Sequence, residues 1–109
     1  MNDIETMHKV YVGIGSNIDP VTNIRNCIKS LKESFTKLNL SPVYESSSMG
    51  FDGPNFYNLV AYFETKIELK SLKKVLNEIE SKNGRSLGEV KFSSRTLDID
   101  ILYFDNLID

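Results

Sequence analysis

The chain has 109 residues, 40% of them hydrophobic and 26% charged, and its formal net charge at pH 7 is −2. These values suit one small globular domain and exclude collagen-like, repetitive and strongly disordered classes. Because a net negative chain has no basic field to hold nucleic acid or an anionic membrane, we expect small molecules as its partners, with no nucleic acid and no membrane among them.

Local composition gives an expectation for the compartment. The single cysteine, Cys27, excludes an internal disulfide, and its apolar neighbours suggest a buried thiol in a reducing compartment. No run approaches the ~20 apolar residues of a membrane span, and the polar start of the chain has no signal core. We therefore expect a cytoplasmic protein, with residues 1–7 as a flexible extension and residues 8–109 as a single domain. His8, the only histidine, is expected to be a surface residue without a partner.

The first half of the chain contains signals for three elements. Apolar alternation predicts a strand over His8–Gly15. Asp19 and Pro20 then predict a helix start, with the aspartate as N-cap and the proline at the first helical position, and helical spacing continues to about Phe35. A second strand is predicted within Leu38–Ser47, where a proline favours a late start or an edge position.

The second half of the chain predicts two strands, a helix and two loops. A loop at Ser48–Pro54 precedes a central strand at Asn55–Thr65. A helix at Glu68–Gly84, ended by its glycine, is followed by a polar loop at Arg85–Arg95 and a last strand at Leu97–Phe104. The order is β-α-β-β-α-β, which predicts an α+β ferredoxin-like sandwich: a four-stranded antiparallel sheet with two helices on one face.

Strand alternation assigns residues to the two faces of this sheet. The residues expected against the helices are Val10, Val12, Ile14, Tyr57, Leu59, Phe63, Leu97, Ile99 and Ile101. The opposite face is expected to carry Gly13, Phe56, Asn58, Asp98 and Asp100.

Two carboxylates on that second face suggest a metal site. Asp98 and Asp100 are two residues apart in a strand, so both side chains leave the same face with Cα atoms ~6–7 Å apart. Neighbouring like charges are unfavourable unless a cation lies between them, and Mg²⁺ takes one or two carboxylates while leaving positions for phosphates. An isolated Asp-x-Asp is more often a solvated acidic strand face paired with lysines, and this alternative stays open.

Two arginines strengthen the phosphate interpretation. Arg95 lies three residues before Asp98, and Arg85 directly follows the second predicted helix. Guanidinium groups beside such carboxylates suit phosphate transfer, in which charge develops on nonbridging oxygens. Surface positions, or simple salt bridges to the aspartates, explain the same spacing equally well.

Several motifs together carry a resemblance to a known family. The most specific is Arg95-Thr96-Leu97-Asp98-Ile99-Asp100-Ile101-Leu102, and the others are Gly84-Arg85, Gly13-Ile14-Gly15-Ser16-Asn17, Tyr44–Gly50 and Phe56-Tyr57-Asn58. From about His8 to Asp109, the sequence resembles the 6-hydroxymethyl-7,8-dihydropterin pyrophosphokinases of folate biosynthesis.

The resemblance implies an activity and a set of site residues. It implies transfer of the β,γ-pyrophosphoryl group of ATP to the pterin hydroxymethyl group, with two Mg²⁺ ions held by Asp98 and Asp100. The catalytic residues would be these aspartates together with Arg85 and Arg95. The nucleotide would lie beside Asn77, Glu80, Arg95 and Ile101, and the pterin would contact Ser46, Met49, Phe56 and Asn58.

The sequence also departs from the family pattern. Phe92, Ser93 and Ser94 replace a tryptophan-glycine-proline run, and Ser48 replaces a proline in the segment that ends at Gly50. The family continues beyond the position of Asp109 with a histidine-proline segment, basic residues and a second pterin-stacking aromatic. The chain is therefore either a fragment of a longer protein or a shortened relative whose activity is reduced, altered, lost or completed by a second subunit. We expect it, as a monomer or homodimer, to bind MgATP measurably and to turn over pterin poorly unless a second subunit covers the open side.

Two rival functions remain at the level of sequence. One is a shortened, non-catalytic relative that binds nucleotide or pterin as a sensor or assembly module. The other is a ferredoxin-like RNA-binding domain, which is disfavoured because the sequence suggests neither paired aromatics on adjacent central strands nor a basic surface.

Overall fold

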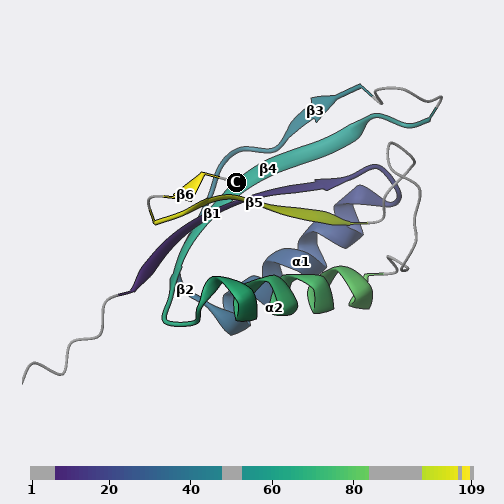
Figure 1. Cartoon of the computed structure of the whole chain (residues 1–109). Helices are drawn as coiled ribbons and strands as arrows, with labels where there is room; N and C mark the ends of the chain where they lie inside the picture. The colour runs from purple at the N-terminus through teal and green to yellow at the C-terminus, as the bar shows by residue number, and fades with distance from the viewer. Residues whose placement is uncertain (1–6, 48–52, 84–96, 106, 109) are drawn as a thin grey trace, which may run out of the picture.

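Eight elements make up the part of the chain that this computed structural model describes, residues 7–47, 53–83, 97–105 and 107–108. In chain order they are β1 (His8–Ser16), α1 (Pro20–Ser34), β2 (Thr36–Leu40), β3 (Tyr44–Ser46), β4 (Phe56–Thr65), α2 (Leu69–Lys82), β5 (Asp98–Phe104) and β6 (Leu107–Ile108) (Figure 1). The predicted α+β class and ferredoxin-like arrangement are confirmed. The two predicted loops lie largely outside the described residues.

The strands form one six-stranded antiparallel sheet in the order β2-β4-β1-β5-β6, with β3 also paired to β4. The prediction of four strands is therefore wrong in number, although all four predicted segments contribute to the sheet. The predicted second strand is divided into β2 and β3, because Pro42 has no N–H to donate to a ladder. At this break the Ser41 N–H donates to the Val60 carbonyl, and the Ser41 Oγ accepts the Val60 N–H, both at 2.8 Å.

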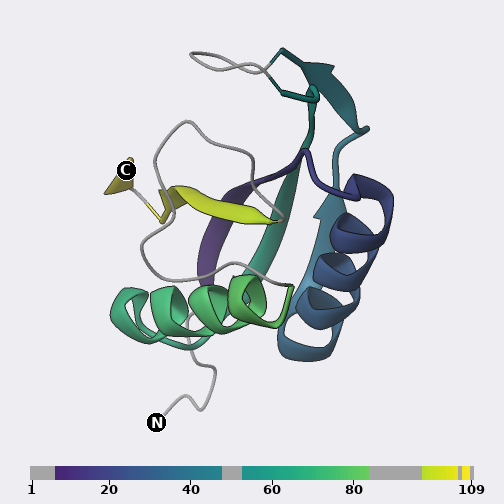
Figure 2. The same ribbon diagram turned by 90° about the vertical axis from the view of Figure 1, so that its right-hand side faces the viewer.

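Both helices lie on one face of the sheet, as predicted (Figure 1). Figure 2 shows α1 and α2 next to each other on that side of the strands. Between the layers lies an apolar core of Val10, Val12, Ile14, Ile24, Cys27, Leu31, Phe35, Leu59, Ala61, Phe63, Leu72, Leu76, Ile79, Leu97, Ile99, Ile101 and Phe104. None of the described helices has the length and hydropathy to cross a membrane.

One residue predicted for the core is on the surface instead. Tyr57 has the core-facing parity of β4, but its side chain is 38% exposed. It lies opposite Ser16, the last residue of β1, and opposite Glu45 of the short strand β3. Few side chains of the described residues cover it at this end of the sheet, and the prediction for Tyr57 is wrong.

The start of α1 matches the prediction in position but not in chemistry. Asp19 is the N-cap and Pro20 the first helical residue, yet the Asp19 side chain makes no capping hydrogen bond and its φ is 45°. The Asn23 side chain donates to the Ile18 carbonyl at 2.7 Å instead. At the other end α1 stops at Ser34, and the next residue, Phe35, stacks on Phe63 in the core with ring centroids 4.1 Å apart.

A thiol and a carboxylate lie inside the apolar layer. Cys27 is buried, as expected, and burial, followed by the nearby charge of Glu80, raises the pKa of the thiol to about 12. Glu80 is only 5% exposed, and its Oε2 accepts the Ile99 N–H at 2.7 Å. This bond ties α2 to β5 between the two aspartates of that strand.

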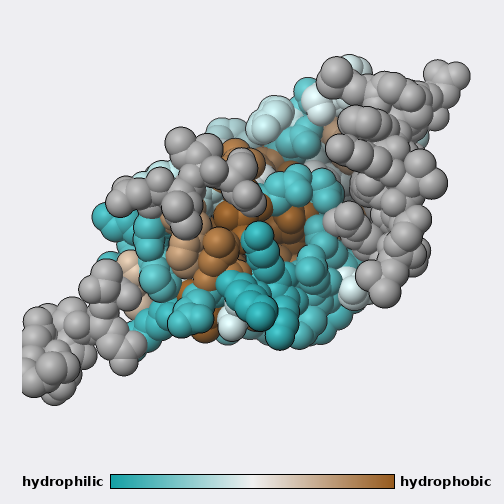
Figure 3. Space-filling model, viewed as in Figure 1, coloured by the Kyte–Doolittle hydropathy of each residue, from teal (hydrophilic) through white to brown (hydrophobic). Residues whose placement is uncertain are grey.

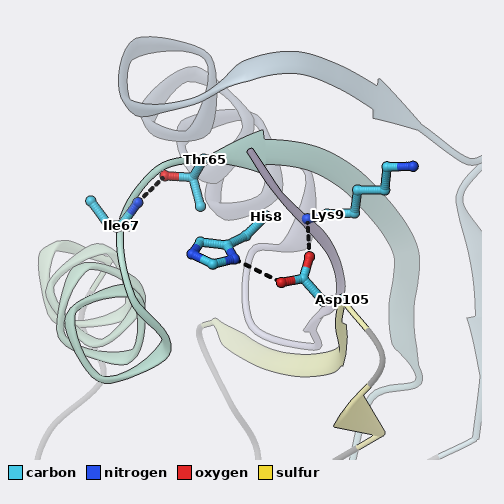
Figure 4. Close-up of polar contacts among 5 residues, drawn as sticks. All are labelled: His8, Lys9, Thr65, Ile67 and Asp105. Atoms are coloured by element: carbon cyan, nitrogen blue, oxygen red, sulfur yellow. Dashed lines mark hydrogen bonds and ion pairs between the residues drawn. The ribbon is translucent and has the colours of Figure 1, made fainter. Parts of the chain in front are cut away.

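His8 has partners, contrary to the expectation from the sequence. Its Nδ1 lies 2.7 Å from Asp105 Oδ2, and its ring packs on Phe104 with centroids 4.7 Å apart. The other carboxylate oxygen of Asp105 accepts the Lys9 N–H at 2.8 Å (Figure 4). These residues are 96 and 97 positions apart in the chain, so only the antiparallel pairing of β1 with β5 brings them together.

Asp105→Asn is expected to weaken the pH dependence of stability in acid. The Lys9 N–H first, and then the His8 side chain, hold the pKa of Asp105 below its ordinary value of 3.8. The carboxylate is therefore favoured in the folded state, so its contribution is complete above the unfolded-state pKa and is lost as the pH falls through the lower folded-state pKa. Urea midpoints measured from pH 7 down to pH 2 should fall less steeply below pH ~4 in the variant than in the wild type.

Asp19→Asn is the matched control for this measurement, because the Asp19 side chain makes no capping hydrogen bond at its exposed position. Its urea midpoints should fall below pH ~4 as steeply as those of the wild type. An equally steep fall in Asp105→Asn would contradict the stabilising role of the Asp105 carboxylate.

Candidate functional site

A row of residues crosses the face of the sheet that carries no described helix. Gly15 on β1 lies opposite Asn58 of β4 on one side and opposite Asp98 of β5 on the other. Tyr44 of β3 lies opposite Asn58 and extends the row. We call Tyr44, Asn58, Gly15 and Asp98 the polar row. Its centre is a glycine, so the amide and the carboxylate come from strands about 10 Å apart, and the strand between them adds no side chain of its own.

The Asn58 side chain is oriented by contacts on both sides. Its Nδ2 donates to Ser46 Oγ at 2.8 Å, and Ser46 lies opposite Phe56 in the β3–β4 pairing. A Cβ added at Gly15 would stand 3.0 Å from Asn58 Oδ1 and 3.7 Å from Phe56 Cδ1. The amide and the half-buried ring therefore both lie close to the bare backbone of β1.

A second contact near the polar row was not anticipated from the sequence. Ser16 and Asn17 follow Gly15 and are almost completely buried. The Asn17 side chain donates to the Pro54 carbonyl at 3.0 Å, two residues before Phe56. It thereby holds the beginning of β4 against the end of β1. The only hint of this contact in the sequence was that Asn17 belongs to the motif Gly13–Asn17. The sequence alone suggested no structural role for the asparagine.

The two aspartates provide a donor set that suits magnesium. Asp98 is half-buried, and Asp100 is exposed in the next row, opposite Gly13. Their parity is opposite to that of the buried residues Ile99 and Ile101, so the pair belongs to the face away from the core. Carboxylate oxygens are the hard ligands that Mg²⁺ prefers, and one or two of them suffice where phosphates complete the shell. Among the described residues no group of three or more His, Cys, Asp and Glu side chains stands ready to hold a metal alone.

The residues expected beside a nucleotide lie where α2 meets β5. Asn77 is exposed on α2, whereas Glu80 is buried and already accepts the Ile99 N–H. Ile101 is buried with its side chain in the core, which leaves its backbone for contact with a ligand. Figure 3 shows hydrophobic side chains reaching the surface beside β5, next to the hydrophilic outer side of α2. Three other expected site residues, Met49, Arg85 and Arg95, lie outside the described residues.

The other end of the same face is aromatic. Tyr11 of β1 lies opposite Tyr62 of β4 and Tyr103 of β5, with ring centroids 4.9 Å and 5.7 Å away. A hollow of about 360 Å³ beside them is lined by Tyr11, Asn39, Leu40, Ser41, Val60 and Tyr62. The expectation that adjacent central strands carry no aromatic pair is therefore wrong. The case against RNA binding now depends on charge, since the whole chain is net negative.

Comparison with known proteins adds an independent line of support. Residues 11–108 match the model of the family described as 7,8-dihydro-6-hydroxymethylpterin-pyrophosphokinase (HPPK). The chain is similar to proteins named 2-amino-4-hydroxy-6-hydroxymethyldihydropteridine pyrophosphokinase. The relative from Helicobacter pylori is 32% identical over 96% of this chain and 68% of its own length, and that from Aquifex aeolicus is 36% identical over 94% and 65%. A third, from Pseudomonas putida, is 34% identical over 93% and 87%. This chain thus spans about two thirds of the length of the first two.

Proposed function

Since this chain belongs to the 7,8-dihydro-6-hydroxymethylpterin-pyrophosphokinase family, we propose that it transfers pyrophosphate from ATP to the hydroxymethyl group of 6-hydroxymethyl-7,8-dihydropterin, a step of folate biosynthesis. The observation that carries the proposal is the polar row, which aligns Asn58, Gly15 and Asp98 on one open face. An amide for a heterocyclic edge and a carboxylate for a metal-bound phosphate stand on either side of one bare strand.

The acceptor half of the proposed site lies on β3 and β4. Phe56 stacks on the pterin ring, and Asn58 hydrogen-bonds to its edge. Ser46 and Met49 complete this pocket from the segment that includes β3. The closeness of Asn58 and Phe56 to the backbone of Gly15 supports this division of roles, because the amide and the ring that would contact the pterin then lie beside one another above β1.

The phosphate half lies on β5. Asp98 and Asp100 hold two Mg²⁺ ions in this proposal, and the metal supplies charge neutralisation and polarisation of phosphoryl oxygens. Arg85 and Arg95 stabilise the charge that develops during transfer. The pterin hydroxymethyl oxygen attacks the β-phosphorus of ATP, and the bond from that phosphorus to the α,β-bridging oxygen breaks. AMP leaves with that oxygen, and the hydroxyl proton passes to solvent.

The nucleotide extends toward α2 in the same proposal. Asn77 contacts it with an exposed side chain, and Ile101 contacts it through the backbone of β5. Glu80 contributes from beneath by holding the Ile99 N–H, and hence β5, in place. In this proposal the phosphates of ATP would lie near Asp98 and Asp100, beside the pterin hydroxymethyl group.

The test uses phosphorus NMR to monitor the formation of AMP and the pterin pyrophosphate ester from ATP and 6-hydroxymethyl-7,8-dihydropterin. The rate is measured across a protein dilution series. We expect measurable MgATP binding and formation of AMP, with a rate per chain that rises with concentration if a second copy contributes to the site. Binding of MgATP and pterin without any AMP would instead support the non-catalytic sensor or assembly module. Absence of both binding events would refute the proposal.

A further inference from the structure

We propose that Gly15 is a positioning residue of this site: its bare Cα gives the Asn58 amide its place, and Ser46 holds the amide there from the opposite side. The inference concerns the acceptor half of the proposed pyrophosphokinase site and rests on that function for its effect on pterin. The position of the Asn58 side chain, from which the inference is argued, depends only on the packing of β3, β4 and β1.

The space above Gly15 is already filled. An added Cβ would stand 3.0 Å from Asn58 Oδ1, which is closer than ordinary van der Waals contact. The Nδ2 of the amide is bonded to Ser46 Oγ at 2.8 Å, so any shift of the amide acts on that bond. The added atom would also lie 3.7 Å from Phe56 Cδ1. A methyl group at Gly15 therefore forces the amide to shift by a few tenths of an ångström, which strains its bond to Ser46.

Gly13 supplies a natural contrast. It lies on the same strand and the same face, two residues away, and neither glycine has the positive φ that only glycine adopts easily. A Cβ at Gly13 would meet Leu102 Cδ1 at 3.5 Å, an ordinary contact with an apolar side chain that already covers it. The two positions thus share backbone and face but differ in what an added methyl group displaces.

The Ser46 bond also determines which ring edge the site accepts. With Nδ2 engaged by Ser46, Asn58 Oδ1 is the atom turned toward β1, above Gly15. A carbonyl oxygen only accepts hydrogen bonds, so the group facing it must donate an N–H. A ring that contacts Oδ1 must therefore present an N–H, while the second hydrogen of Nδ2 can still donate to an acceptor on the same ring.

Gly15→Ala is expected to weaken the affinity for 6-hydroxymethyl-7,8-dihydropterin about tenfold, the size of one lost hydrogen bond, while MgATP affinity stays unchanged. Gly13→Ala should change neither affinity by more than about twofold. Both measurements use calorimetric titration, with thermal unfolding to verify that both variants are folded. Equal pterin affinities of the two variants would contradict the proposal.

A double-mutant cycle separates positioning from a general disturbance of the sheet. In an Asn58→Ala background the crowding atom is gone, so Gly15→Ala should have no further effect on pterin affinity. A full tenfold loss in that background would show that Gly15 acts by another route, and the proposal would fail.

A readout that needs no pterin distinguishes this inference from the proposed function. The nuclear Overhauser contact between the Asn58 side-chain amide protons and the Ser46 β-protons is expected to have the same intensity in the wild type and in Gly13→Ala, and to be weaker in Gly15→Ala. A weaker contact in Gly15→Ala without any pterin binding by the wild type would refute the pterin function and leave the positioning role standing. An unchanged intensity in Gly15→Ala would overturn the positioning role itself.

Discussion

Asp98→Asn and Asp100→Asn are each expected to weaken magnesium-dependent ATP binding at least about a hundredfold, because groups that only support a metal ligand already cost 10- to 100-fold when removed. An amide has no negative charge to offer the cation, and the site has few other protein donors: among the described residues no larger acidic or histidine cluster replaces the pair. Both side chains are on the face away from the apolar core, so the fold should change little.

Calorimetric titration of MgATP, with a parallel titration of ATP in EDTA, measures this effect. The wild type should lose affinity when magnesium is removed, whereas the variants should bind ATP equally weakly with and without it. Asp19→Asn is the control, because it removes the same charge at an exposed helix end outside β5. Unchanged MgATP affinity in both β5 variants would remove the metal assignment and favour a solvated acidic strand face.

Glu80→Ala is expected to lower the free energy of unfolding by about 2–4 kcal/mol, the range for leaving a buried hydrogen-bond donor unpaired together with a lost buried side chain. The carboxylate is 5% exposed and accepts the Ile99 N–H at 2.7 Å. No water is expected to replace it in this apolar surrounding. Glu80→Gln keeps an acceptor oxygen of similar shape, so it should lose less than half as much.

Urea unfolding measures these changes, and Glu78→Ala is the control because Glu78 is exposed on the same helix. Glu78→Ala should change stability by less than about 0.5 kcal/mol. Hydrogen exchange at the Ile99 amide adds a local readout, since this N–H should exchange much faster in Glu80→Ala. Equal stability of Glu78→Ala and Glu80→Ala would show that the bond from the Glu80 carboxylate to the Ile99 N–H does not stabilise the fold.

The parts of the fold that follow from local periodicity were predictable. Alternation along β1 and β5 assigned Val10, Val12, Ile99 and Ile101 to the core, and all four are buried. The same period of two assigned Asp98 and Asp100 to one face before any partner strand was known. The order of the elements then followed from the residues that begin or end them, such as Pro20 and Gly84.

Contacts between distant segments were not predictable in this way. His8 has partners only because β1 and β5 pair over a separation of 97 residues, and no local pattern encodes that pairing. Tyr57 has the alternation of a core residue, but exposure depends on how far neighbouring elements extend past it. The pairing of Tyr11 with Tyr62 likewise depends on a register that the sequence leaves open.

By itself the sequence determined the order of elements, the two faces of each strand and, through its motifs, the family to which the chain belongs. Successive side chains of a strand point to opposite faces because the backbone is pleated, so these features need no tertiary information. Only the tertiary structure decided that Asn58, Gly15 and Asp98 share one row, that Ser46 orients the amide and that Glu80 ties α2 to β5. Register between distant strands depends on the packing of the whole core, because a slip of one residue would turn every buried side chain of a strand toward solvent.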